Sequence, residues 1–244
     1  MWSTEFNYID KENSSFWVDT SRVEKSRTAD GQRIIYQSIY SGSLANNYDL
    51  MLTNADEDGR SIIWATSLKK EWDNGFNIFT AYTHQDITEV NLGTNSTASS
   101  NYQYNVVINR NEELVGNAYY ETEHRFVFNL GYKANWFGDN ETRINLTFER
   151  RSGRPLSYTL DAFNDNDLGD QRDFQNSDVY LPYIPTGPSD TNIDWAGSIW
   201  PGATTNEEKY AAMLEVIKGA GLEGYAGGYA PKYSRNHRGL TIWI

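Results

Sequence analysis

The segment Glu121–Arg154, ETEHRFVFNLGYKANWFGDNETRINLTFERRSGR, contains two stretches of alternating apolar and polar residues joined by a short polar turn. The apolar positions are Phe126, Phe128, Leu130, Tyr132, Ile144, Leu146 and Phe148, and the polar positions between them include Arg125, Asn129, Lys133, Arg143, Asn145, Thr147 and Glu149. Successive side chains of a β-strand point to opposite faces. The segment therefore predicts a hairpin with one apolar and one ionic face.

Two environments suit such a hairpin. In a soluble sandwich the apolar face packs on a second sheet and the polar face meets water. In an outer-membrane barrel the apolar face meets lipid and the polar face lines the lumen. The remainder of the chain distinguishes the two.

Composition excludes several classes of protein. Of 244 residues 39% are apolar, and no run approaches the roughly 20 apolar residues of a spanning helix. A net charge of −12 argues against nucleic acid as a partner. The absence of cysteine excludes disulfides and Cys-based metal sites or nucleophiles. Aromatic residues, at 14%, suit interfacial girdles and carbohydrate-binding surfaces equally well.

Alternation also predicts strands elsewhere, at Trp2–Tyr8, Tyr48–Asn54, Ser61–Lys70 and Phe76–His84. The last three form a predicted antiparallel meander, with tight turns at Asp56–Gly59 and Asp73–Gly75. Between the first strand and this meander, Lys11–Asn47 is expected to be a long loop with one short strand at Arg33–Gln37. The predicted fold class is therefore all-β.

The lengths of the connections favour a barrel. Two long, polar connections, Asp86–Tyr120 and Arg151–Arg235, alternate with short turns, and only the brief Asp56–Gly59 breaks the pattern. Outer-membrane barrels have short periplasmic turns and long extracellular loops. A soluble sandwich has no reason for this asymmetry. We therefore expect a partial, open segment of a large outer-membrane barrel.

One short helix is predicted within the last connection, over Thr205–Lys218. Thr205 and Glu208 match a capping box, and Gly219 is expected to end the helix. Its apolar stripe predicts packing on neighbouring loops rather than membrane binding. The chain begins within a predicted strand, shows no signal peptide and ends in the strand-like GLTIWI, so we expect a fragment of a longer protein.

Several segments resemble one family. LKKEWDNGFNIFTAYTHQD, TNSTASSNY, the hairpin quoted above and YLPYIPTGP are similar to the C-terminal barrel of TonB-dependent outer-membrane receptors of the Oar-like group, which carry a carboxypeptidase-regulatory-like domain. The resemblance covers about 48–235. Its most specific motif is Ser152, Gly153, Arg154 and Pro155 followed by the aromatic Tyr158.

The resemblance implies a receptor that imports a bulky nutrient across the outer membrane of a Gram-negative bacterium without covalent catalysis. Residues 1–244 would be part of its barrel domain, lacking the plug and the C-terminal strands. Implied partners are outer-membrane lipid, the plug, the TonB energy-coupling complex and an unidentified nutrient. The alternatives are a soluble β-rich glycan-binding module and, third, a β-rich hydrolase.

Few residues suggest chemistry. Arg151 and Arg154 are candidates for gripping an anionic ligand, although structural pairing of this arginine cluster, which includes Arg150, with Glu149 or Glu121 is the preferred interpretation. The acidic segment Asp161–Asp170 fails the EF-hand ligand pattern, and a solvated loop is favoured over a Ca²⁺ site. The spacing of His84, His124 and His237 matches no metal motif, so no metal or cofactor is predicted. The adjacent carboxylates Glu112–Glu113 and Glu207–Glu208 give no sign of convergence.

Overall fold

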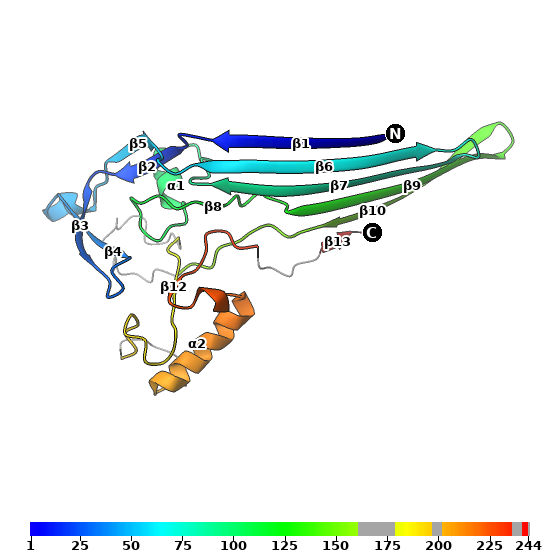
Figure 1. Ribbon diagram of the computed structural model, residues 1–244. Helices are drawn as coiled ribbons and strands as arrows, with labels where there is room; N and C mark the ends of the chain where they lie inside the picture. Colours follow the sequence, from blue (N-terminus) through cyan, green and yellow to red (C-terminus); the bar gives the residue numbers. More distant parts are fainter. Residues whose placement is uncertain (161–178, 197–201, 236–240, 244) are drawn as a thin grey trace.

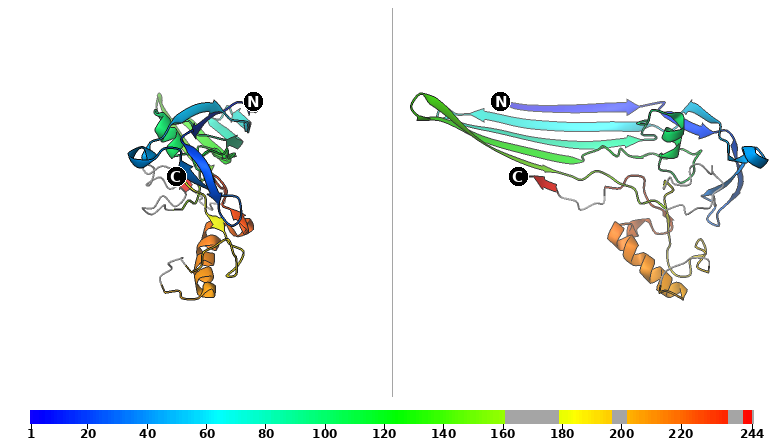
Figure 2. Two further views of the ribbon diagram at one scale, coloured as in Figure 1. Left: turned by 90° about the vertical axis from the view of Figure 1, so that its left-hand side faces the viewer. Right: turned by 180° about the vertical axis from the view of Figure 1, so that it is seen from behind.

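A long antiparallel sheet and a lobe at one end of it make up the protein (Figures 1 and 2). The lobe consists of the described residues of the three long connections between sheet strands, 12–58, 90–123 and 152–235. The computed structural model describes residues 1–160, 179–196, 202–235 and 241–243. The sheet contains β1 (Trp2–Lys11), β6 (Gly59–Glu71), β7 (Phe76–Glu89), β9 (His124–Phe137), β10 (Asn140–Arg151) and β13 (Thr241–Trp243), with the short β8 (Gly116–Asn117) beside β7. The all-β prediction is confirmed, and within the described residues no sheet closes into a barrel.

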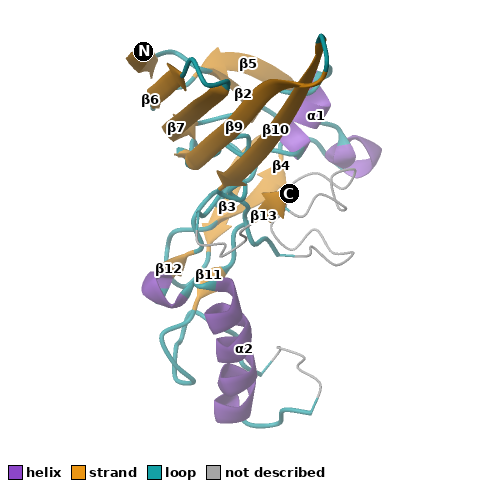
Figure 3. Ribbon diagram, turned by 90° about the vertical axis from the view of Figure 1, so that its right-hand side faces the viewer, coloured by secondary structure: helices purple, strands orange, loops and turns teal. Residues whose placement is uncertain are grey.

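The strand order of the sheet is β1-β6-β7-β9-β10-β13, with every neighbour antiparallel. Seen from the hairpin end, the strands form a single layer (Figure 3). The register places Trp2 opposite Leu68, Leu68 opposite Thr80, and Thr80 opposite Phe128. Because directly opposed residues share a face, the even-numbered side chains of all five long strands lie on one side. The predicted hairpin at 121–154 is confirmed, with Phe128 opposite Phe148.

Both tight turns lie at the end of the sheet far from the lobe (Figure 1). Between β6 and β7, Gly75 has a φ of +90° and its N–H donates to the carbonyl of Trp72 at 3.1 Å. Between β9 and β10, Gly138 has a φ of +67°. A positive φ favours glycine, so both positions suit that residue. These two predicted turns are confirmed.

The predicted meander is wrong in one strand. β5 (Leu50–Asn54) lies in the lobe and pairs with β2 (Ser15–Asp19), whereas β6 pairs with β1 and β7. Residues 56–59 therefore lead from the lobe into the sheet and do not form a hairpin. The true connection from β1 to β6 is residues 12–58, which is long. All three lobe-side connections are thus long, and the exception to the predicted asymmetry disappears.

The predicted loop at 11–47 is also more structured than its polar composition suggested. It contains β2, β3 (Arg22–Arg27), β4 (Ile34–Ser38) and a 3₁₀ turn at Gly42–Asn46. β3 pairs with β4, near the one strand that was predicted here. The 86–120 connection begins later than expected, since β7 runs to Glu89, and it contains α1 (Ala98–Gln103) and β8. Short paired segments of this kind lack the length for a clear alternation pattern.

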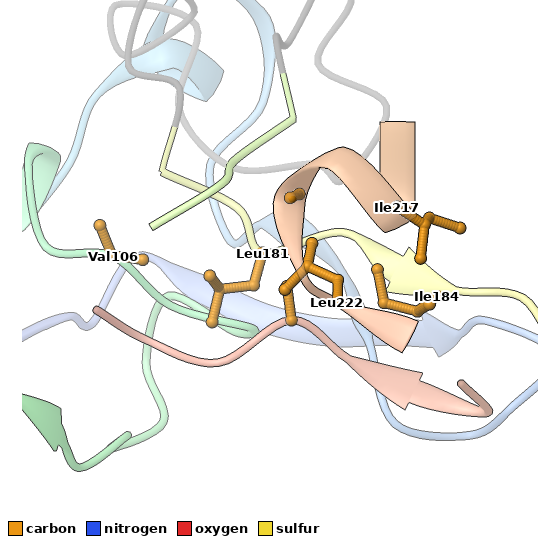
Figure 4. Close-up of a cluster of buried hydrophobic side chains, with 7 residues drawn as sticks. Val106, Leu181, Ile184, Ile217 and Leu222 are labelled. Atoms are coloured by element: carbon orange, nitrogen blue, oxygen red, sulfur yellow. The ribbon is translucent and has the colours of Figure 1, made fainter. Parts of the chain in front are cut away.

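The lobe has its own hydrophobic core. β11 (Tyr183–Ile184), α2 (Asn206–Ala220), a 3₁₀ turn at Glu223–Tyr225 and β12 (Gly228–Tyr229) surround it. The buried side chains, several of which Figure 4 shows, are Val106, Leu181, Ile184, Ile217, Ala220, Leu222 and Ala230. They come from segments far apart in the chain, so the lobe is a packed unit and not a set of separate loops.

The predicted helix at 205–218 is confirmed as α2, including its capping box, in which the hydroxyl of Thr205 accepts the N–H of Glu208 at 3.2 Å. Its end was predicted wrongly. The helix continues through Gly219 to Ala220, and Gly221 ends it in the left-handed conformation at φ +68°. Met213 and Ile217 pack on the lobe core, which agrees with the predicted packing role. The helices in the described part of the chain all lack the length and apolarity of a transmembrane span.

Candidate functional site

The apolar face, defined as the even-numbered side chains of β1, β6, β7, β9 and β10, is the most unusual surface of the molecule. Ile144, Leu146 and Phe126 keep 52%, 56% and 38% of their surface exposed. Phe128 and Phe148 are only partly exposed, and the Phe148 ring lies edge-on to that of Phe126 at 6.5 Å. The other large exposed members are Trp2, Phe6, Tyr8, Trp64, Leu68, Phe76 and Trp136. A contiguous apolar surface of this kind marks an interaction site.

The apolar face has a defined extent along the strands. On β9 it runs from Phe126 to Trp136, ten residues apart, or about 34 Å at 3.4 Å per residue. At the usual barrel tilt of about 40° this length corresponds to a band roughly 26 Å high. The Asp, Glu, Lys and Arg residues at even-numbered positions of these strands lie at the two ends of the face: Lys70 near the hairpin end, and Asp10, Arg60, Asp86 and Arg150 where the strands approach the lobe.

Aromatic side chains gather at the hairpin end of the apolar face. The rings of Phe76 and Tyr132 are 4.5 Å apart, and those of Tyr132 and Trp136 are 5.9 Å apart. Trp72 and Phe137 are exposed at the same end. The structure thus brings these aromatic residues to one edge of the sheet.

The polar face consists of the odd-numbered side chains of the same strands. Arg125 and Glu149 form an ion pair on it at 2.9 Å. Near the middle of the sheet, Gly131 faces the amides of Asn77 and Asn145, and a Cβ at this glycine would lie 2.6 Å and 2.9 Å from their side chains. The two amides, from the strands on either side, therefore cover the glycine on this face.

An ionic network joins the lobe to the sheet. Glu121 is fully buried, and its carboxylate accepts from the Nε and Nη2 of Arg235 at 2.6 and 2.8 Å and from the backbone N–H of Ile87 at 2.6 Å. Arg235 also donates to Asp86 at 2.7 Å, which in turn accepts from Arg60 at 2.9 Å. The hydrogen bonds to Glu121 raise the pKa of Arg235, although partial burial opposes them. The network fixes the start of β9 to the chain that leaves the lobe.

The predicted arginine cluster lies at the same junction. Arg151 is the last residue of β10, exposed opposite Arg125, and Arg154 is exposed three residues further on. The preferred structural partners were predicted wrongly, because Glu149 pairs with Arg125 and Glu121 pairs with Arg235. The pair of Glu121 and Arg235 could not be predicted from the sequence, because its members are 114 residues apart.

The motif residues connect the sheet with the lobe. The N–H of Ser152 donates to the carbonyl of His124 at 2.8 Å, Gly153 is exposed and Pro155 is buried. Leu156 then exchanges two backbone hydrogen bonds with Ser234, and Tyr158 packs on the lobe core. The motif residues therefore form the connection between the end of β10 and the lobe. The pairing of Arg235 with Glu121 was not predicted. The one feature of the sequence that pointed to Arg235 is that the family resemblance extends to this residue.

Two of the histidines considered for metal binding, His84 and His124, lie side by side on neighbouring strands. The rings of His84 and His124 stack at 5.0 Å, with the hydroxyl of Tyr82 bonded to His124 at 2.9 Å. His237 and the acidic segment 161–170 lie outside the described residues. Within the described ranges no group of three or more His, Asp or Glu side chains forms a metal-binding cluster.

The adjacent carboxylates have separate structural partners. Glu112 accepts from Asn109, and Glu113 accepts the backbone N–H groups of Asp56 and Glu57. Glu208 caps α2.

Comparison with protein-family models, with curated proteins and with solved structures finds no match to this chain.

Proposed function

We propose that the chain forms part of the wall of an outer-membrane β-barrel, in a TonB-dependent receptor that imports a bulky nutrient. The observation that carries the proposal is the uncovered apolar face, on which Ile144 and Leu146 remain more than half exposed. In water such a surface would drive association or a second layer of packing. Against hydrocarbon the same side chains carry no free-energy cost of hydration, so the face needs no second layer of protein.

Three further features support a membrane wall. The estimated height of the apolar band, roughly 26 Å, is close to the outward-facing band of about 25 Å that barrels present to lipid. Aromatic rings mark its hairpin edge, as they do at membrane interfaces. Every connection at one end is a tight turn, and every connection at the other end is long, as barrels require when the two ends face different compartments.

The proposal requires further strands to close the sheet. Unpaired backbone groups are not tolerated in hydrocarbon, because lipid offers them no hydrogen-bond partner. β1 pairs on one side only, with β6, among the described strands. In the proposed receptor both sides of this segment continue into neighbouring strands, and a plug fills the lumen beside the polar face.

In this arrangement the lobe is extracellular, because long loops face outward in such barrels. It would capture the nutrient, and Arg151 and Arg154 remain candidate contacts for an anionic group on it. The energy-coupling complex would act on the plug from the periplasmic side, where the tight turns lie. The sheet itself provides a wall and performs no covalent chemistry.

The test uses neighbouring residues on opposite faces. The chain has no cysteine, so Leu146→Cys and Thr147→Cys each introduce a single thiol on the apolar and polar face, respectively. In isolated outer membranes, a maleimide attached to a lipid should label the thiol at 146 and not that at 147. A small water-soluble maleimide should show the reverse preference.

Equal labelling of both positions by the soluble reagent would contradict the proposal. So would recovery of the full-length protein from the aqueous fraction after lysis. That second result would favour a soluble glycan-binding module, for which the exposed Trp64 and the partly exposed Tyr82, with rings 5.7 Å apart, would be the stacking surface.

A further inference from the structure

His84 and His124 face each other across β7 and β9, at the end of the apolar face that adjoins the lobe. The N–H of Gln85 donates to the carbonyl of Glu123 at 2.9 Å, so the pair next to the histidines is hydrogen-bonded. Because the two kinds of pair alternate along an antiparallel ladder, His84 and His124 form a non-hydrogen-bonded pair, in which side chains approach most closely. Their ring centres are 5.0 Å apart.

The hydrogen bonds of the two rings prepare nitrogens for a metal ligand role. Nδ1 of His84 lies 3.1 Å from the backbone carbonyl of Glu123, which can only accept, so Nδ1 carries the proton and Nε2 of the neutral ring carries a lone pair. Nδ1 of His124 lies 2.9 Å from the hydroxyl of Tyr82. When this Nδ1 donates to the hydroxyl, Nε2 of His124 carries a lone pair as well. Histidines that bind metals donate their other ring N–H to an oxygen in this way.

Charge and access both suit a cation at this pair. The side chain of His124 is 50% exposed, and a carboxylate oxygen of Glu123 lies 3.6 Å from its Nε2. His84 is partly exposed. His124 precedes Phe126, the last residue of the apolar band on β9, by two residues, so water reaches the pair in the proposed membrane arrangement. The pair itself exists whether or not that arrangement is correct.

We propose that His84 and His124 together bind a first-row transition-metal ion, Cu²⁺ most tightly, through one nitrogen of each ring. Imidazole is a good ligand for Cu²⁺, Ni²⁺ and Zn²⁺, and the affinity is highest for Cu²⁺. Because each metal–nitrogen bond is about 2 Å long, two nitrogens on one ion are at most about 4 Å apart. The rings, stacked at 5.0 Å and 26°, need only a small rotation about their soft χ2 torsions to meet this requirement.

The ion would join β7 to β9 at the edge of the lobe. Within the described residues no third His, Asp or Glu side chain completes a cluster, so water would occupy the remaining positions around the ion. The spacing of the histidines along the chain did not predict this site, because the pairing of the two strands creates it.

The experiment titrates Cu²⁺ alone into purified full-length protein, with His84→Gln, His124→Gln and the double change as variants. Either single change should remove the same tight Cu²⁺ site and leave binding at least about a hundredfold weaker, because a chelated ion needs both rings. The double change should then remove no more than either single change. The electron paramagnetic resonance spectrum of Cu²⁺ at this site in the parent should show coupling to two nitrogens.

His237→Gln is the matched control, because it removes the third histidine of the chain and leaves the pair intact. It should leave the tight site unchanged. If the double change removes twice as much binding as each single change, the two rings bind separately and the proposal is overturned. Coupling to one nitrogen in the parent would overturn it as well, whatever the variants show. Labelling at Leu146→Cys and Thr147→Cys tests the membrane assignment separately, since no Cu²⁺ result depends on it.

Discussion

Glu121 and Arg235 are 114 residues apart in the chain and are joined by two hydrogen bonds of 2.6 and 2.8 Å. The carboxylate is fully buried and the guanidinium is largely buried. The pair joins the two ends of the stretch 121–235, which contains β9, β10 and part of the lobe. It thereby ties the lobe to the sheet.

We expect Glu121→Gln to lower the free energy of unfolding by about 3 kcal/mol, because it leaves the guanidinium of Arg235 without its main counter-charge. The matched control is Glu149→Gln, which breaks the exposed pair with Arg125 and should cost about 0.5 kcal/mol. Chemical denaturation of each variant measures both. If the double variant Glu121→Gln, Arg235→Gln is no less damaging than the sum of its two single changes, the two residues do not act as a pair.

The two turn glycines should respond differently to alanine. At Gly138 the surroundings are open, so Gly138→Ala adds only the strain of a positive φ, about 1 kcal/mol. At Gly75 a Cβ would lie 2.2 Å from the carbonyl oxygen of Lys133, so Gly75→Ala should cost about 3 kcal/mol. Equal losses of stability in the two variants would show that the close approach of the β6–β7 turn to β9 does not exist in solution.

The two faces of β10 should differ in their tolerance of charge. Leu146→Arg should cost about 2–4 kcal/mol of stability in a bilayer, because it places a cation against lipid. Thr147→Arg, on the polar face, should change stability by less than about 0.5 kcal/mol. Urea-induced unfolding in lipid vesicles measures both values. A larger effect at Thr147 than at Leu146 would reverse the assignment of the faces.

Lys232 should make the stability of the lobe pH-dependent. Its ammonium is buried and donates to the carbonyl oxygens of Val90 and Leu114 and to the side chain of Asn105. Burial lowers the pKa of Lys232 to about 7 from a usual value of 10.5, against the opposing charge of Glu89. Between these two pH values the unfolded chain binds a proton that the folded chain has released, so the free energy of unfolding should rise with pH.

Lys232→Met serves as the control for that titration, because it removes the titrating group. The difference between the parent protein and this variant should change from pH 7 to pH 10 and level off below pH 7. Unfolding measured by denaturant at each pH gives both curves. Parallel curves across the whole range would show that the folded state does not shift the pKa of Lys232.

The alternation of residues determined the strands and their faces. Phe126, Leu130, Ile144 and Leu146 were assigned to one side by a period of two, and the register confirms that assignment, because the pleat leaves no other arrangement. Local chemistry also determined the turn at Gly75 and the capping box at Thr205. Both depend on contacts between residues that are close in the chain.

Only the tertiary structure decided what pairs with what over long separations. It placed β1 beside β6 and moved β5 into the lobe, because the partner of a strand depends on the path of the chain and not on the pattern within the strand. It also united Glu121 with Arg235 across segments whose polar composition carries no periodicity. The faces of the sheet are a local property of the sequence, whereas the lobe and its attachment exist only once distant segments have packed together.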